Sequence, residues 1–164
     1  MDKYIGKSVM RGIAIGRIYL YKKVDVQVTD RKVADAAAEK ERFFAAVDGA
    51  KAQLTKLYDE ALQNVGEDHA AIFDVHRMLL EDEDYLAAAA GEIENGYNAV
   101  YAVDQAGTQF AELFAAMDDE YMRGRAADIR DISQRVIRIL LDLPEEEINS
   151  EEPVVLVAED LTPS

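Results

Sequence analysis

The sequence predicts a mainly α fold: an antiparallel helical bundle of two helical hairpins inserted into an incomplete α/β domain. Apolar residues recur every three or four positions over about 110 residues in the middle of the chain, which is the period of amphipathic helices. Short segments rich in β-branched residues stand on either side of that region. Together they amount to roughly 20–25 residues, too few for an independent sheet, whereas helices joined by short turns form a bundle readily.

The two flanking segments predict strands. Residues 12–21, Gly-Ile-Ala-Ile-Gly-Arg-Ile-Tyr-Leu-Tyr, favour one or two strands, and the alternation from Val24 to Val28 predicts an extension of that region. Val154–Val157 is an apolar run typical of a buried strand. We therefore expect residues 1–30 to form an N-terminal β segment and residues 145–164 a linker followed by a returning strand.

Helix signals divide the central region, residues 31–144, into five helices. Gly66 and the Asn95-Gly96 pair are helix stops, Asn98 is a candidate N-terminal cap, and Pro144 ends the last helix. Acids in the first turns of several segments suit the helix dipole. The predicted helices cover residues 33–65, 67–80, the acidic run 81–84 to about 95, 98–117 and 119–143.

Composition narrows the classes of function. The net charge of −15 makes nucleic acid and anionic membranes unsuitable partners, so we expect neither, and a protein partner should present a basic face. The alternative is that the charge serves solubility alone. Without cysteine there is no thiolate zinc site or cysteine nucleophile. No signal peptide or membrane span is evident, which favours a cytoplasmic location.

Several strings, in this order, resemble Enzyme I, the phosphoenolpyruvate–protein phosphotransferase of bacterial sugar uptake. The resemblance covers essentially the whole chain. One departure is Met10-Arg11, where the family usually has Ser-Pro. The strings are Gly12–Gly16, the stretch Ala71–Asp84 with its His and Met-Leu-Leu-Glu-Asp, Asp118–Tyr121 with Arg125–Ile132, and Val155–Ser164.

The resemblance implies phosphoryl transfer from phosphoenolpyruvate to an enzyme histidine and then to the small phosphocarrier protein HPr. It implies that the helical region, residues 31–144, docks HPr and that the strands belong to a phosphohistidine-type α/β domain. The family's Gly-Gly-x-x-Ser-His motif is absent from the sequence. We therefore expect no catalytic residue and no cofactor in this chain, and no activity from it alone. A C-terminal domain, also absent, would bind phosphoenolpyruvate and Mg²⁺ and form the homodimer.

The second predicted helix carries the candidate docking surface. Ile72, His76 and Leu79 share one stripe, which we expect to face outward as an apolar centre, while Phe73 and Leu80 face the bundle. Seven acids between residues 67 and 84 bracket this stripe, and the alternative is that they form only a solvated face. The predicted HPr-binding residues are Glu67, Asp68, Ala71, Ile72, His76, Leu79, Asp82, Glu83, Asp84, Tyr121 and Arg125.

Other roles for these residues stay open. His76 could be phosphorylated or structural, but contact is favoured because the family's phosphorylated histidine lies in the absent motif. Arg125 could steer a phosphoryl group or simply pair with Asp128 three residues on. The acidic run 81–84 lacks the spacing and central glycine of an EF-hand, so we expect no metal site.

Two other proteins fit parts of the pattern. One is a stand-alone acidic helical interaction or scaffold domain, which the two strand segments argue against. The other is a phosphoenolpyruvate-using dikinase, which shares the swivelling phosphohistidine domain but not the helical insertion. A Gly-Gly-x-x-Ser-His motif encoded by the DNA beyond codon 164 would decide for the Enzyme I family.

Overall fold

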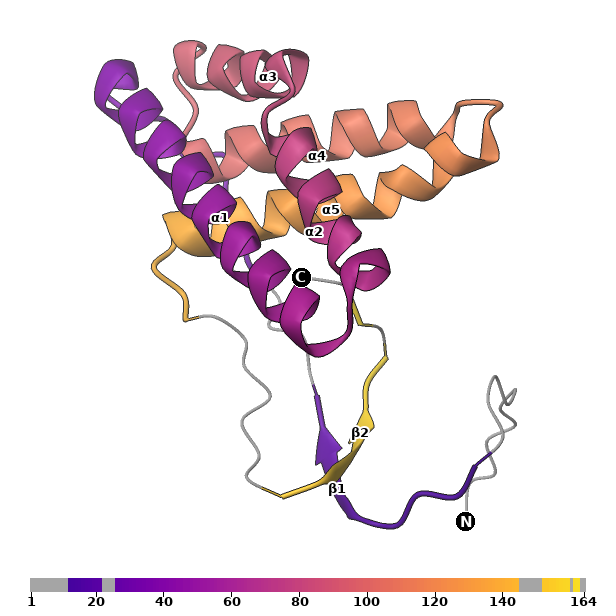
Figure 1. Cartoon of the computed structure of the whole chain (residues 1–164). Helices are drawn as coiled ribbons and strands as arrows, with labels where there is room; N and C mark the ends of the chain where they lie inside the picture. The colour runs from indigo at the N-terminus through magenta and orange to yellow at the C-terminus, as the bar shows by residue number, and fades with distance from the viewer. Residues whose placement is uncertain (1–11, 22–25, 145–151, 160, 163–164) are drawn as a thin grey trace, which may run out of the picture. The chain divides into compact units, whose positions relative to one another are not determined.

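The computed structural model describes residues 12–21, 26–144, 152–159 and 161–162. One compact unit holds the two strands and the other holds the five helices (Figure 1). The predicted mainly α class, with a helical bundle inserted between two strands, is confirmed. The elements in order are β1 (Arg17–Leu20), α1 (Ala36–Asn64), α2 (Glu67–Leu80), α3 (Glu83–Glu94), α4 (Ala99–Ala115), α5 (Glu120–Leu140) and β2 (Val154–Val157).

The two strands form a parallel pair, in which Arg17 lies opposite Val154 and Leu20 opposite Val157. Parallel strands need a long crossover, and here the five helices lie within it in the sequence. The predicted extension of β1 through residues 24–28 is wrong where the structure describes it. Residues 26–28 form no strand, and Val26 and Val28 instead pack against the helical core. The helical unit therefore starts at residue 26, five residues before the predicted boundary at 31.

Side-chain caps fix the starts of four helices. Asp35, Asp82, Asn98 and Asp119 each accept a hydrogen bond from the backbone N–H three residues on. Such caps satisfy one of the N–H groups that a helix start leaves free. The turn between α1 and α2 uses Gly66 with a φ of 95°, a conformation that favours glycine.

The helices pack as two hairpins, α1 with α2 and α4 with α5, while α3 packs on α4 (Figure 1). The largest fully buried side chains include Phe43 and Leu54 of α1, Leu80 of α2, Tyr85 of α3 and Ile132 of α5. Val103 of α4 is also fully buried. All five helices therefore contribute side chains to one core. In the described part of the chain, no helix is long and apolar enough to cross a membrane.

Candidate docking site on α2 and α5

Exposed acids stand at both ends of α2. Glu67 and Asp68 occupy its first turn, and the run Glu81–Asp84 follows its last. Asp82 also caps α3, because its carboxylate accepts a hydrogen bond from the Tyr85 backbone N–H at 2.9 Å. Acids in these first turns are stabilised by the helix dipole. The acids that we predicted for docking are therefore solvent-exposed, and they flank the middle of α2.

The outward apolar stripe of α2 differs from the predicted one. Ala71, Val75 and Met78 follow each other at four- and three-residue steps, and Met78 is 62% exposed. Ile72 and Leu79 are half-buried rather than fully exposed, and Leu79 packs against the core. The expectation that Ile72 and Leu79 are exposed is thus wrong in part, since the helix is rotated so that Met78 is its most exposed large apolar side chain.

His76 is fully buried, so the prediction that it faces a partner is wrong. Its Nε2 lies 3.4 Å from Asp128 Oδ1, and its Nδ1 lies 3.6 Å from Asp131 Oδ2. Both carboxylates belong to α5, so His76 joins α2 to α5. The physical reason is that a polar ring enters a protein interior where charged or hydrogen-bonding groups face it, and α5 supplies two carboxylates. A ring buried to this degree offers no nitrogen to a docking phosphoryl donor.

Arg125 is held within α5 by two neighbours. Its Nη1 donates a hydrogen bond to Asp128 Oδ2 at 2.9 Å, and its Nη2 donates one to the hydroxyl of Tyr121. The guanidinium also lies over the Tyr121 ring, 4.4 Å from its centroid. Burial lowers the pKa of Arg125, but the hydrogen bonds and charge interactions with Asp128 and Tyr121 together outweigh burial and leave it raised. Tyr121 itself is 66% exposed, so this pair reaches the surface.

Several residues of this region, Met78 of the apolar stripe among them, were absent from the predicted site. Asp128 and Asp131 interleave with Ile129 and Ile132 on the inward side of α5, and Asp131 is buried with them. An acid among the buried positions of an amphipathic helix needs a polar partner, and this pattern could have indicated one. Leu113, near the end of α4, is 53% exposed and carried no sequence signal that separated it from core leucines.

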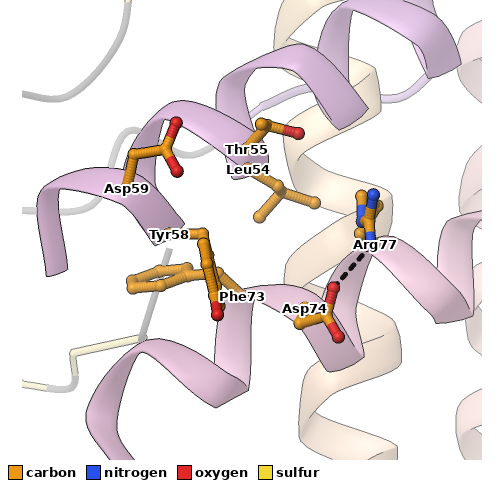
Figure 2. Close-up of a pocket in the computed structure, with 7 residues that line it drawn as sticks. All are labelled: Leu54, Thr55, Tyr58, Asp59, Phe73, Asp74 and Arg77. Atoms are coloured by element: carbon orange, nitrogen blue, oxygen red, sulfur yellow. Dashed lines mark hydrogen bonds and ion pairs between the residues drawn. The ribbon is translucent and has the colours of Figure 1, made fainter. Parts of the chain in front are cut away.

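Around His76 the described residues offer no group of three His, Asp or Glu side chains arranged to hold a metal ion. A pocket of about 320 Å³ does lie between α1 and α2 (Figure 2). Figure 2 shows Tyr58 and Phe73 side by side in it and Arg77 paired with Asp74 at its edge. None of the predicted docking residues lines this pocket, so it is separate from the candidate site.

Comparison with known proteins decides the family. A family model described as "PEP-utilising enzyme, N-terminal" matches residues 5–125. The chain belongs to this family. Two curated relatives are each named phosphoenolpyruvate-protein phosphotransferase: that of Bacillus sp. (strain S) is 43% identical over 97% of the chain, and that of Bacillus subtilis (strain 168) is 38% identical over all of it. The chain spans 28% and 29% of their lengths.

Solved structures of PEP-utilising enzymes show the same fold. A solution structure of Enzyme I superposes with a TM-score of 0.78 at 31% sequence identity. The match covers 90% of this chain and 61% of the chain in that structure. A second structure, the N-terminal domain of the nitrogen-type Enzyme 1, gives a TM-score of 0.73 at 30% identity and covers 93% and 63%. The chain therefore corresponds to part of the N-terminal domain of Enzyme I.

Proposed function

We propose that this chain docks the phosphocarrier protein HPr through α2 and the start of α5. The observation that carries the proposal is the apolar stripe on α2, with Met78 at its most exposed point and acids at both ends. The whole protein would transfer a phosphoryl group from phosphoenolpyruvate to one of its histidines and then to HPr, in the cytoplasm. This chain supplies binding and orientation, while a histidine, a Mg²⁺ site and a dimer interface outside the sequence supply the rest.

The charge pattern supports a partner with a basic rim. Six exposed acids flank the α2 stripe, and the whole chain carries a net charge of −15. Opposite potentials raise the rate of encounter and fix orientation, while buried apolar contacts slow dissociation. We therefore assign the association rate to the acids at residues 81–84 and the lifetime of the complex to Met78 and its neighbours.

Arg125 and Tyr121 form the second part of the docking surface. A guanidinium presents five N–H donors in one plane, which suits carboxylates and phosphoryl oxygens. Asp128 accepts one hydrogen bond from Nη1 of Arg125, and Tyr121 accepts one from Nη2. The other N–H groups of the guanidinium remain as further donors. We infer that these donors meet an acid or the phosphorylated side chain of HPr.

Surface-binding kinetics with purified HPr test this function. The double substitution Glu83→Lys and Asp84→Lys should slow association about tenfold or more with little effect on dissociation. The matched control is Glu41→Lys with Asp48→Lys, the same change in net charge on exposed positions of α1. Two results would contradict a docking role for the acids of α2: equal effects of the two pairs of substitutions, or no binding of HPr to the unmodified chain. The acids would then form only a solvated face.

A further inference from the structure

We propose that His76 is a positioning residue: it fixes the Asp128 carboxylate, which in turn holds Arg125 in place for docking. The inference rests on the proposed HPr-docking function and adds a residue that has no access to the partner. His76 is fully buried, whereas Arg125 stands beside the exposed Tyr121. The effect of His76 on binding must therefore pass through another side chain.

Asp128 can transmit that effect because each of its oxygens has a different neighbour. Oδ1 lies 3.4 Å from His76 Nε2, and Oδ2 accepts the hydrogen bond from Arg125 at 2.9 Å. The side chains of Asp128 and Arg125 are 13% and 16% exposed, so water has limited access to either. With His76 in place, the carboxylate has a polar neighbour on each side, the ring on one and the guanidinium on the other. Without it, the Oδ1 side is free and the carboxylate can turn away from Arg125.

A purely structural role explains the ring less well. Neither ring nitrogen of His76 makes a hydrogen bond, although Nε2 and Nδ1 face carboxylates at 3.4 and 3.6 Å. Burying a polar ring without hydrogen bonds to its nitrogens lowers the stability of the fold, whereas burying an apolar side chain of similar volume does not. The contacts instead specify orientation. A neutral imidazole can direct one N–H to Asp128, and the imidazolium can direct one to each carboxylate.

The first measurement uses the free chain. The Nε–Hε signal of Arg125, identified by its loss in Arg125→Ala, reports how firmly the guanidinium is held. In His76→Leu and in Asp128→Asn we expect this signal to shift and to exchange faster with water. His76→Gln keeps an N–H donor near Asp128 and should restore most of the signal. The control is Ser133→Ala, which removes a buried hydroxyl of α5 bonded to Tyr85 and should leave the Arg125 signal unchanged.

The second measurement is a double-mutant cycle for HPr binding. We expect His76→Leu to weaken binding about fivefold in the unmodified chain and less than twofold in the Arg125→Ala background, because coupled side chains are not additive. Ser133→Ala should lower the melting temperature without weakening binding. Asp128→Asn probes the same contact from α5, so the result does not depend on the folding of one variant.

Two results would overturn the proposal, and a third separates it from the docking function. An unchanged Arg125 signal in folded His76→Leu removes the link to the guanidinium. An equal loss of affinity with and without Arg125 shows that His76 acts by another route. If the unmodified chain does not bind HPr, the docking function fails, and the Arg125 signal in the free chain still decides whether His76 positions that side chain.

Discussion

Gly107 of α4 lies so close to Ser133 of α5 that a β-carbon on Gly107 would stand 2.3 Å from Ser133 Oγ. Ser133 cannot move away freely, because its hydroxyl donates to the Ile129 carbonyl at 2.7 Å and is bonded to the Tyr85 hydroxyl at 2.9 Å. The absence of a side chain at Gly107 therefore sets the distance between α4 and α5, the helix that carries Arg125 and the two carboxylates facing His76.

Gly107→Ala should destabilise the chain by about 1–3 kcal/mol, the usual cost of overpacking a core. Chemical denaturation followed by circular dichroism measures this. Gly91→Ala in α3 is the matched control, since a β-carbon there meets nothing within 4 Å. That change should stabilise the helix by about 0.5–1 kcal/mol, as alanine does relative to glycine. Equal stabilities of the two variants would contradict the close approach of α4 and α5.

Tyr85 should make stability fall at alkaline pH. Burial raises its pKa to about 12, although the hydrogen bond with Ser133 opposes this. Between pH 10 and 12 the unfolded chain loses a proton that the folded chain keeps, so the free energy of unfolding decreases as pH rises. Tyr85 makes its full contribution to the free energy of unfolding below about pH 10. The loss of that contribution above about pH 12 lowers the free energy of unfolding by about 3 kcal/mol. Tyr85→Phe should flatten the pH profile in this window, and parallel profiles for the two chains would refute the assignment.

The helix positions could be predicted because local signals set them. α2 was predicted at Glu67–Leu80 and has those bounds, since Gly66 breaks the chain before it and the acidic run follows it. Asn98 caps α4 as expected. The strand extension failed for a different reason: Val26 and Val28 alternate with polar residues as a strand would, but the core that they meet is helical. Alternation alone does not specify what a segment packs against.

The rotation of α2 could not be predicted in the same way. Apolar residues surround much of this helix, so its own sequence favours several inward faces about equally. Asp128 and Asp131, some fifty residues further along, settle the choice by offering polar contacts to His76. The exposure of the acids at both ends of α2 was easier to predict, because exposed charge at helix ends depends little on tertiary contacts.

The helical unit should fold without the strands. Among the described residues, the buried core lies between Phe43 and Leu140, so residues 26–144 contain that core. Limited proteolysis of the full chain should leave a stable helical fragment of about this extent, with cooperative thermal unfolding. Early cleavage within α1, between Phe43 and Leu57, would contradict the bundle.

Phosphoenolpyruvate and Mg²⁺ should not phosphorylate this chain. His76 is fully buried, and the exposed His69 lies on the first part of α2 with no ion-pair partner among the described residues. Incubation followed by intact-mass measurement should therefore show no added phosphoryl group. Phosphate on His76 would overturn its assignment as a positioning residue, and phosphate on His69 would show that the chain carries chemistry of its own.

The central claim is tested most directly by titrating HPr into the isotope-labelled chain and following its NMR spectrum at two salt concentrations. Exposed charges are screened beyond about 8 Å at physiological ionic strength, so the affinity should fall as salt rises. We predict shifts confined to residues 67–84, the end of α4 and residues 121–125, with Met78 and Arg125 among the largest. Absence of shifts, or salt-independent shifts on the outer face of α1, would contradict docking through α2 and α5.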